Sequence, residues 1–141
     1  MLEFRLFAHG AAFDVDAFLA STTLVPDFVW RHGDQRRYAC IDSRHVTSGV
    51  EFLLGDGATV PLPEQECIAV AYLETHRDAL RALARCPGVD AFILGLQYRT
   101  TVESNVIGFS LGPSGQLMRC CSDVGCEPVY YVTLERLPEA T

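Results

Sequence analysis

The stretch VDAFILGLQY, residues 89–98, decides the fold class of this chain. If this stretch is a strand, both of its faces carry apolar side chains. One face has Phe92, Leu94, Leu96 and Tyr98, and the other has Val89, Ala91 and Ile93. A strand that is apolar on both sides is typical of a sheet interior with layers on both faces. We therefore expect residues 89–98 to be a central strand that is covered twice.

Five further segments have the two-residue period, or the β-branched and aromatic content, that is typical of strands. They are residues 2–8, 38–41, 46–54, 107–111 and 128–134. In the first segment, apolar residues alternate with Glu3, Arg5 and His9, which predicts a strand with one buried face.

Three helices are expected between these strands. Asp14 can cap a short helix that carries Val15, Phe18 and Leu19. The second helix is predicted over residues 63–85, because Pro63 and the acids after it suit a first turn. The alternative is a strand over 66–72 followed by a helix over 76–85, since Thr75-x-x-Asp78 is similar to an independent helix start.

The third helix follows Gly112-Pro113, with Pro113 at its first position. Its apolar stripe has helical spacing and consists of Leu117, Cys120, Cys121 and Val124. Gly125 suits the position just beyond the helix end. We expect Cys120 and Cys121 to be reduced core residues on this stripe.

The predicted order of elements is β-α-β-β-α-β-β-α-β. Strands grouped in pairs between helices indicate an α+β fold with a mostly antiparallel sheet and helices packed on it. A ferredoxin-like arrangement is the nearest simple comparison. We expect one domain over residues 1–137 and a frayed tail over 138–141.

The charge of the chain is acidic. Its 141 residues include 18 acids and 11 bases, all of them Arg, for a net charge of -7. Nucleic acids and anionic membranes bind cationic patches, so we expect neither as a partner and favour a basic protein instead. The absence of an apolar run long enough to span a membrane, and of a secretory signal at residues 1–6, predicts a cytoplasmic protein. The spacing of the cysteines and histidines matches no metal site, and no cofactor motif is present.

The run Trp30-Arg31-His32-Gly33-Asp34 is the most unusual in the chain. Trp and Arg are common at interface hot spots, which suggests a recognition loop. The alternative is that Trp30 packs in the core while Asp34 binds the turn backbone. As partner-binding anchors the sequence predicts Trp30, Arg31 and Tyr98, and as acids that steer a partner it predicts Asp27, Asp34, Asp56 and Glu103.

Two longer stretches carry a resemblance to a known family. Residues 13–34 hold an acid-flanked short helix, Leu-Val-Pro and then Trp-Arg-x-Gly-Asp. Residues 73–131 hold Leu-Glu-x-His-Arg-Asp-Ala-Leu-Arg-Ala-Leu, an apolar strand, Gly-Phe-Ser-Leu-x-Pro, a helix, a glycine cap and a strand with Tyr. In this order they resemble the bacterial domain-of-unknown-function family 4279. The chain departs from the family pattern in a polar loop at residues 99–105 and in the Cys120-Cys121 pair.

The resemblance implies a small α+β domain, favours the single helix over 63–85 and implies no catalytic residue. Such domains are similar to immunity proteins of bacterial polymorphic-toxin and secretion systems, in which a small cytoplasmic protein neutralises a toxin. We therefore expect a non-catalytic protein that acts by protein–protein contact. The alternatives are a regulatory or small-ligand-binding domain that uses the sheet face or the Trp30 loop, and a small enzyme with a His/carboxylate pair.

Overall fold

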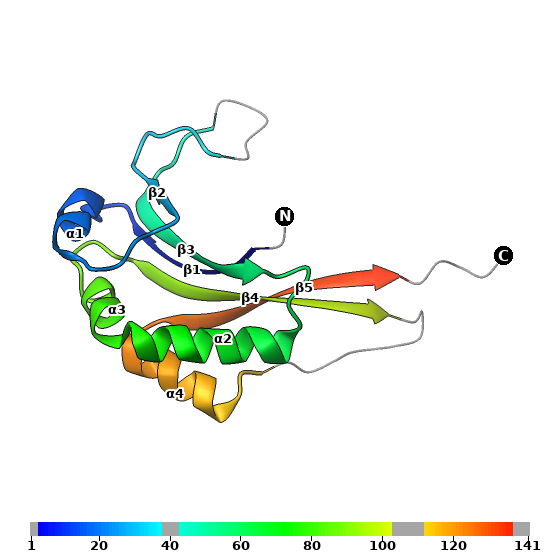
Figure 1. The fold of residues 1–141 in the computed structure, drawn as a ribbon. Coiled ribbons are helices and arrows are strands. Elements are labelled where there is room, and N and C mark those ends of the chain that lie inside the picture. The colour runs from blue at the N-terminus through cyan, green and yellow to red at the C-terminus, as the bar shows by residue number, and fades with distance from the viewer. Residues whose placement is uncertain (1–2, 38–42, 103–111, 137–141) are drawn as a thin grey trace.

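The computed structural model describes residues 3–37, 43–102 and 112–136 of the chain. These residues form a five-stranded sheet with helices packed against it (Figure 1). In chain order the elements are β1 (Glu3–Gly10), α1 (Val15–Ser21), β2 (Phe28–Trp30), β3 (Ser48–Asp56), α2 (Leu62–Thr75), α3 (Arg77–Ala84), β4 (Ala91–Val102), α4 (Gly115–Val124) and β5 (Glu127–Arg136). The strands lie in the order β2-β3-β1-β4-β5.

The α+β class and the mostly antiparallel sheet are confirmed. β1 is antiparallel to both β3 and β4, and β2 is antiparallel to β3. β5 is parallel to β4, because α4 carries the chain back across the sheet between them. β1 therefore occupies the centre of the sheet, and residues 89–98 belong to its neighbour β4.

The order of elements differs from the prediction in two places. The short strand after α1 is β2 (Phe28–Trp30), three residues that have no clear alternation of their own. Where one helix was predicted, the chain has two. The strands expected at 38–41 and 107–111 lie outside the described residues.

The helix predicted over 63–85 breaks at His76, which has φ -108° and ψ 20°. Its first part confirms the helical interpretation of 66–72. The break directs α3 towards α4, where Arg77 and Arg81 both bind the carboxylate of Asp123. Arg81 Nε also donates to the backbone carbonyl of Asp123 at 2.8 Å, close to the negative end of α4. The local sign of this break was the helix-start pattern at Thr75-x-x-Asp78.

One face of the sheet is closed by helices. In Figure 1, α2 and α4 lie along this face, which we call the helix face. Alternate residues of the three inner strands point into it and are almost fully buried: Phe4, Leu6 and Ala8 from β1, Val50 and Phe52 from β3, and Phe92, Leu94 and Leu96 from β4. Burying a Leu or Phe side chain stabilises a fold by about 1.5–3 kcal/mol, so this layer provides most of the stability.

The helix ends follow the sequence closely. Asp14 caps α1 by accepting from the N–H of Ala17 at 3.0 Å, as predicted. The third predicted helix begins later than expected, because the cap is Ser114, whose Oγ accepts from the N–H of Leu117 at 3.2 Å. Gly125 ends this helix with φ 89°, a left-handed conformation that suits glycine.

The predicted cysteine stripe is confirmed for Cys121, which is 2% exposed. Cys120 is only partly buried, and its thiol lies 3.8 Å from Glu74 Oε1 at the surface between α2 and α4. Each cysteine that the structure describes is a free thiol.

The other face of the sheet, which we call the open face, is not covered by a second layer of helices as residues 89–98 suggested. Here the β2–β3 loop, described over residues 31–37 and 43–47, rises beyond the sheet edge (Figure 1). On β4 this face is covered by neighbouring side chains, since the ring of Tyr131 lies 3.0 Å from where a Gly95 Cβ would be. None of the helices described is long and apolar enough to cross a membrane.

Candidate functional site

Strand alternation places a row of functional side chains on the open face. In β1 these are Arg5, Phe7 and His9, which point away from the helices because their neighbours point into the core. Register places Phe7 beside Glu51 of β3, and Glu51 beside Phe28 of β2. The row therefore crosses the sheet from its centre to its edge.

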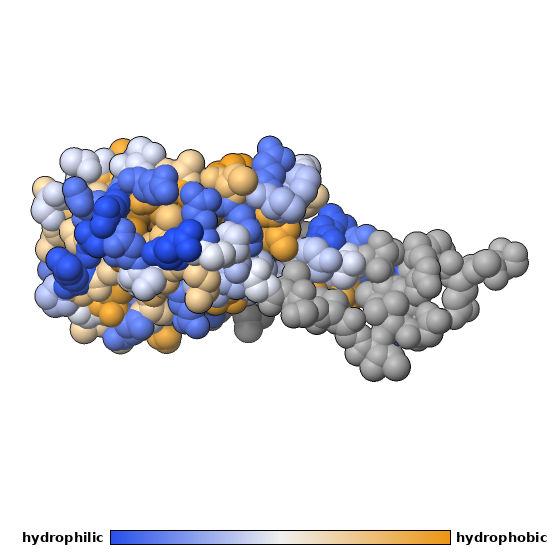
Figure 2. All heavy atoms as spheres, turned by 90° about the horizontal axis from the view of Figure 1, so that it is seen from below, coloured by the Kyte–Doolittle hydropathy of each residue, from blue (hydrophilic) through white to orange (hydrophobic). Residues whose placement is uncertain are grey.

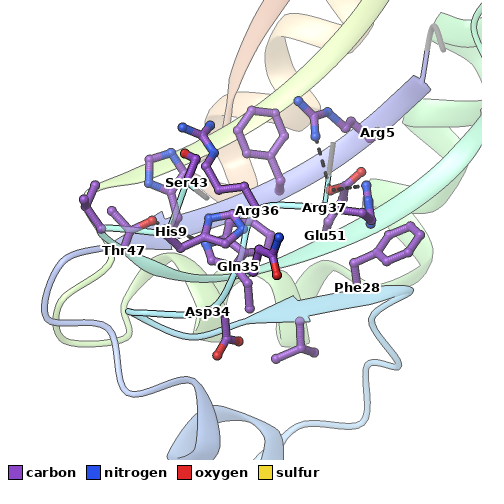
Figure 3. Close-up of a pocket in the computed structure, with 15 residues that line it drawn as sticks. Arg5, His9, Phe28, Asp34, Gln35, Arg36, Arg37, Ser43, Thr47 and Glu51 are labelled. Carbon is purple, nitrogen blue, oxygen red and sulfur yellow. Dashed lines mark hydrogen bonds and ion pairs between the residues drawn. The ribbon is translucent and has the colours of Figure 1, made fainter. Parts of the chain in front are cut away.

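The β2–β3 loop adds a wall to this row and creates a pocket of about 800 Å³, shown in Figure 3. We call it the open-face pocket. It is lined by Arg5, Phe7, His9, Phe28, Val29, Trp30, Asp34, Gln35, Arg36, Arg37, Ser43, His45, Val46, Thr47 and Glu51. A pocket of this size is within the range of small-molecule sites, about 300–1,000 Å³.

Trp30 is a wall of this pocket. Its ring lies over Gly49, where an added Cβ would be 2.2 Å from Trp30 Cζ2. The imidazole of His45 stacks on it, with the ring centroids 5.3 Å apart, and Nε1 donates to Thr47 Oγ1 at 3.4 Å. Trp30 is half-buried and lies on the face opposite the helix-side core. The glycine at 49 is thus required by the close approach of the indole.

One end of the pocket holds a cluster of paired charges around Glu51, whose side chain is only 4% exposed. Glu51 Oε2 lies 3.2 Å from Arg5 Nη1 and 3.5 Å from Arg37 Nη2. Arg37 is also 3.5 Å from Glu3 Oε2, and its guanidinium lies 3.4 Å above the centre of the Phe28 ring. These contacts attach the β2–β3 loop to the sheet.

Burial raises the pKa of Glu51 above its ordinary value. The guanidinium of Arg5 opposes this shift, the nearby carboxyl of Glu3 adds to it, and Arg37 opposes it more weakly. The free-energy cost of removing the Glu51 carboxylate from water therefore exceeds the stabilisation that the carboxylate gains from Arg5 and Arg37.

The polar groups at the other end of the pocket have fewer hydrogen bonds and ion pairs to the rest of the described chain. In Figure 3, Arg36 and Ser43 of the loop and His9 of β1 lie together at this end. Arg36 is held by its backbone, since its N–H donates to the carbonyl of Ser43 at 2.8 Å. His9 Nδ1 is buried and has no hydrogen-bond partner among the described residues. Burial, and then the charge of Arg36, lowers the pKa of His45, so its imidazole is neutral at pH 7.

Of the predicted site residues, Trp30 and Asp34 line the pocket. Asp34 Oδ2 also accepts from the N–H of Arg31 at 2.8 Å, which is the turn role considered from the sequence. The side chain of Arg31 turns away towards α1, where it forms a two-point ion pair with Asp16.

The remaining predicted residues do not join the pocket. Asp27 accepts from the N–H of Leu53 at 2.7 Å, and Asp56 from the N–H of Ala58 at 2.9 Å, so both carboxylates support local backbone. Tyr98 lies on the helix face of β4. Strands β3 and β1 separate β4 from β2, and Tyr98 is seven residues along β4 from the position level with Trp30. Glu103 lies outside the described residues.

Most of the pocket was missed at the sequence level. Its charged residues are Arg5, Glu51, Arg36 and Arg37 beside Asp34. A sign of the first two was present, because alternation in 2–8 and 46–54 places Arg5 and Glu51 on the polar side of their strands. The pair Arg36-Arg37 was a run of charge beside the Trp30 loop.

This arrangement can bind a guest that is partly apolar and partly charged. Among the described residues there is no group of three or more His, Cys, Asp or Glu side chains that could hold a metal ion. The chain matches no protein-family model, no curated protein and no solved structure.

Proposed function

We propose that the protein is a non-catalytic binding protein that acts by protein–protein contact, as a toxin-neutralising immunity protein does, and that the open-face pocket receives part of its partner. The observation that carries this proposal is the composition of the pocket wall. Partly buried Phe28 and Trp30 line the pocket together with the exposed Arg36, and aromatic and Arg side chains are the residues that dominate interface energies.

The pairing of the pocket acids supports binding rather than acid–base chemistry. Glu51 is engaged by Arg5 and Arg37, and Asp34 accepts from a turn N–H. A carboxylate that acts as a general base must be free to reach its substrate. These two carboxylates instead hold the loop that shapes the pocket.

The net charge supports a basic partner, as expected from the sequence. A charge of -7 attracts a cationic surface over the whole molecule and speeds encounter, particularly at low salt. The aromatic anchors then determine how long the complex lasts. A protein of this kind would act in the cytoplasm beside the toxin it neutralises.

A second candidate is a regulatory domain that binds a small ligand. It is favoured by the position of the pocket between the sheet face and the Trp30 loop, and by a volume that fits such ligands. The two candidates share one site and differ in what occupies it.

The test is affinity capture from an extract of the organism that encodes the protein. The baits are the wild type, Trp30→Ala in the pocket and Met118→Ala, which removes an exposed apolar side chain from α4. We expect one protein to be recovered with the wild type and Met118→Ala, and lost with Trp30→Ala, while all three baits keep a cooperative melting transition. Removing an anchor of this type costs about 2 kcal/mol or more of binding.

Equal capture by Trp30→Ala would contradict the assignment of the site. Capture of no protein, together with a small molecule that remains bound to the purified wild type in native mass spectrometry, would favour the second candidate.

A further inference from the structure

We infer that the open-face pocket binds a carboxylate carried on an apolar body, with Arg36 as its counter-charge. This inference rests on the proposed binding function and adds the chemistry of the bound group. The carboxylate belongs either to a protein partner, as an acidic side chain or chain end, or to a free organic acid.

The first step is the charge balance of the lining. Among the described residues, three guanidinium groups and two carboxylates line the pocket, and Glu3 beside it supplies a third carboxylate. Arg5 and Arg37 both face Glu51, and Arg37 faces Glu3 as well. Among the residues that the structure describes, no carboxylate pairs with the guanidinium of Arg36. Arg36 is therefore the guanidinium of the lining that a guest carboxylate can engage without displacing an ion pair among the described residues.

The second step is the supply of hydrogen-bonding groups at that end. His9 lines the pocket, and its Nδ1 is buried without a partner within the described part of the chain, which costs stability. Ser43 and Thr47 also line the pocket and bring hydroxyl groups. A carboxylate has two oxygens to share between a guanidinium fork and such donors.

The third step concerns the size of the guest charge. One uncommitted guanidinium matches the single charge of a carboxylate, whereas a phosphate monoester brings about -1.5 to -2 near pH 7. A cation is disfavoured at this end, because it would face Arg36, while Glu51 already faces Arg5 and Arg37. An apolar body is favoured by the side chains of Phe28, Trp30 and Val46 in the wall.

Other surfaces of the described protein offer weaker support for a binding site. Seen from the helix side in Figure 2, the described residues mix hydrophilic and hydrophobic positions over α2 and α4. The groove there is lined by Arg77 and Asp123, which already bind each other, and by Arg119. Within the described residues Arg119 has no carboxylate partner, and the groove lacks an aromatic wall, which makes Arg119 a matched control for Arg36.

The test uses phenylacetate as the probe and phenylacetamide as its neutral match. Amide chemical shifts of the full chain are followed as each compound is added. We expect phenylacetate to move signals of the β2–β3 loop, β2 and the open-face residues of β1, and phenylacetamide to bind at least about tenfold more weakly. Arg36→Gln should weaken phenylacetate by about tenfold, and Arg119→Gln should leave it unchanged.

Equal binding of the acid and the amide, or binding of phenylacetate that Arg36→Gln leaves intact, would overturn the inference. Both variants replace exposed side chains, so a failure to fold is not expected, and the signals away from the pocket report it directly.

Competition with phenylacetate, together with native mass spectrometry, distinguishes the two sources of the carboxylate. If the carboxylate belongs to a protein, saturating phenylacetate should release the captured partner. If it belongs to a free acid, that acid should appear in native mass spectra of the wild type and be absent from those of Arg36→Gln. The two proposals fail separately. A protein partner captured equally by the wild type and Arg36→Gln would contradict the carboxylate site and leave the protein-binding function standing. Selective binding of the acid with no protein partner captured would support the carboxylate site and contradict the protein-binding function.

Discussion

The two faces of this sheet are built from the same strands and serve different ends. In β1, Phe4 and Leu6 point into the helix face and are fully buried, whereas Arg5, which lies between them, and His9 are partly exposed on the open face. Most side chains of the helix face are apolar and need no particular partner; Gln65 of α2, which hydrogen-bonds the backbone of Gln97, is an exception. The open face joins charges and rings that must meet at set positions.

The difference teaches where stability and function are separated in a small domain. Apolar burial is non-directional, so the helix face tolerates changes of shape better than of volume. Ion pairs and hydrogen bonds are directional, and on the open face they shape a pocket rather than fill a core. Changes on the first face should therefore act on folding, and changes on the second on binding.

The largest effect should come from matched leucines on the two faces. Leu94 is fully buried on the helix face, and Leu53 is 37% exposed on the open face. We expect Leu94→Ala to lower the free energy of unfolding by about 2–5 kcal/mol, and Leu53→Ala by less than about 1 kcal/mol. Urea unfolding measures both, and similar losses would mean that the faces share the stability.

The next effect concerns the glycine under Trp30. A Cβ at Gly49 would lie 2.2 Å from the indole and 2.7 Å from the carbonyl of Ala8, so Gly49→Ala must displace the ring. We expect a loss of about 1–3 kcal/mol, together with a change in Trp fluorescence. At Gly55 the nearest atoms are 3.7 Å from an added Cβ, and Gly55→Ala should do neither. An unchanged fluorescence in Gly49→Ala would place the indole elsewhere.

A smaller effect is expected for the cysteines. Cys121→Ser buries a hydroxyl among apolar side chains of the helix face and should cost about 1–2 kcal/mol. Cys67 is exposed on α2, and Cys67→Ser should change the melting temperature very little. The thiol of Cys121 should also react slowly with a thiol reagent in the native protein, and labelling as fast as that of Cys67 would contradict its burial.

The smallest effect is a pH dependence from Glu51. Because burial raises the pKa of Glu51 in the folded state, the folded protein retains this proton to higher pH than the unfolded chain does. The stability that protonated Glu51 contributes is therefore fully present below the ordinary pKa of Glu, and it is lost as the pH rises through the pKa of Glu51 in the folded protein. Glu51→Gln removes this loss, so its stability relative to the wild type should rise as the pH increases above the ordinary pKa of Glu. A relative stability that falls over this range would show that the Arg pairs outweigh burial.

The sequence predicted the local features well. The α+β class, the alternation in β1, the Asp14 cap and the Gly125 helix end all depend on a few neighbouring residues. The direction of α3 beyond the break at His76 involves Asp123, about fifty residues away, which binds Arg77 and Arg81. A helical period alone could not indicate it.

The site was harder to predict than the fold. β2 is three residues long and is defined by pairing with Gly49 to Glu51, so its own sequence carries little signal. The pocket needs β1, β2, β3 and the loop together, and its charges meet only once the register is set. Trp30 was identified because a single Trp beside Arg is conspicuous, while Arg36 was missed because charged loop residues are ordinary.

The most direct test of the separation between the two faces is hydrogen–deuterium exchange of the wild type, with and without the partner that it captures. If the open face binds, exchange should slow in residues 28–37 and 43–51 and in β1, and stay unchanged in α4. Slower exchange over α2 and α4, with residues 28–37 and 43–51 unaffected, would place the interface on the helix side and contradict the account.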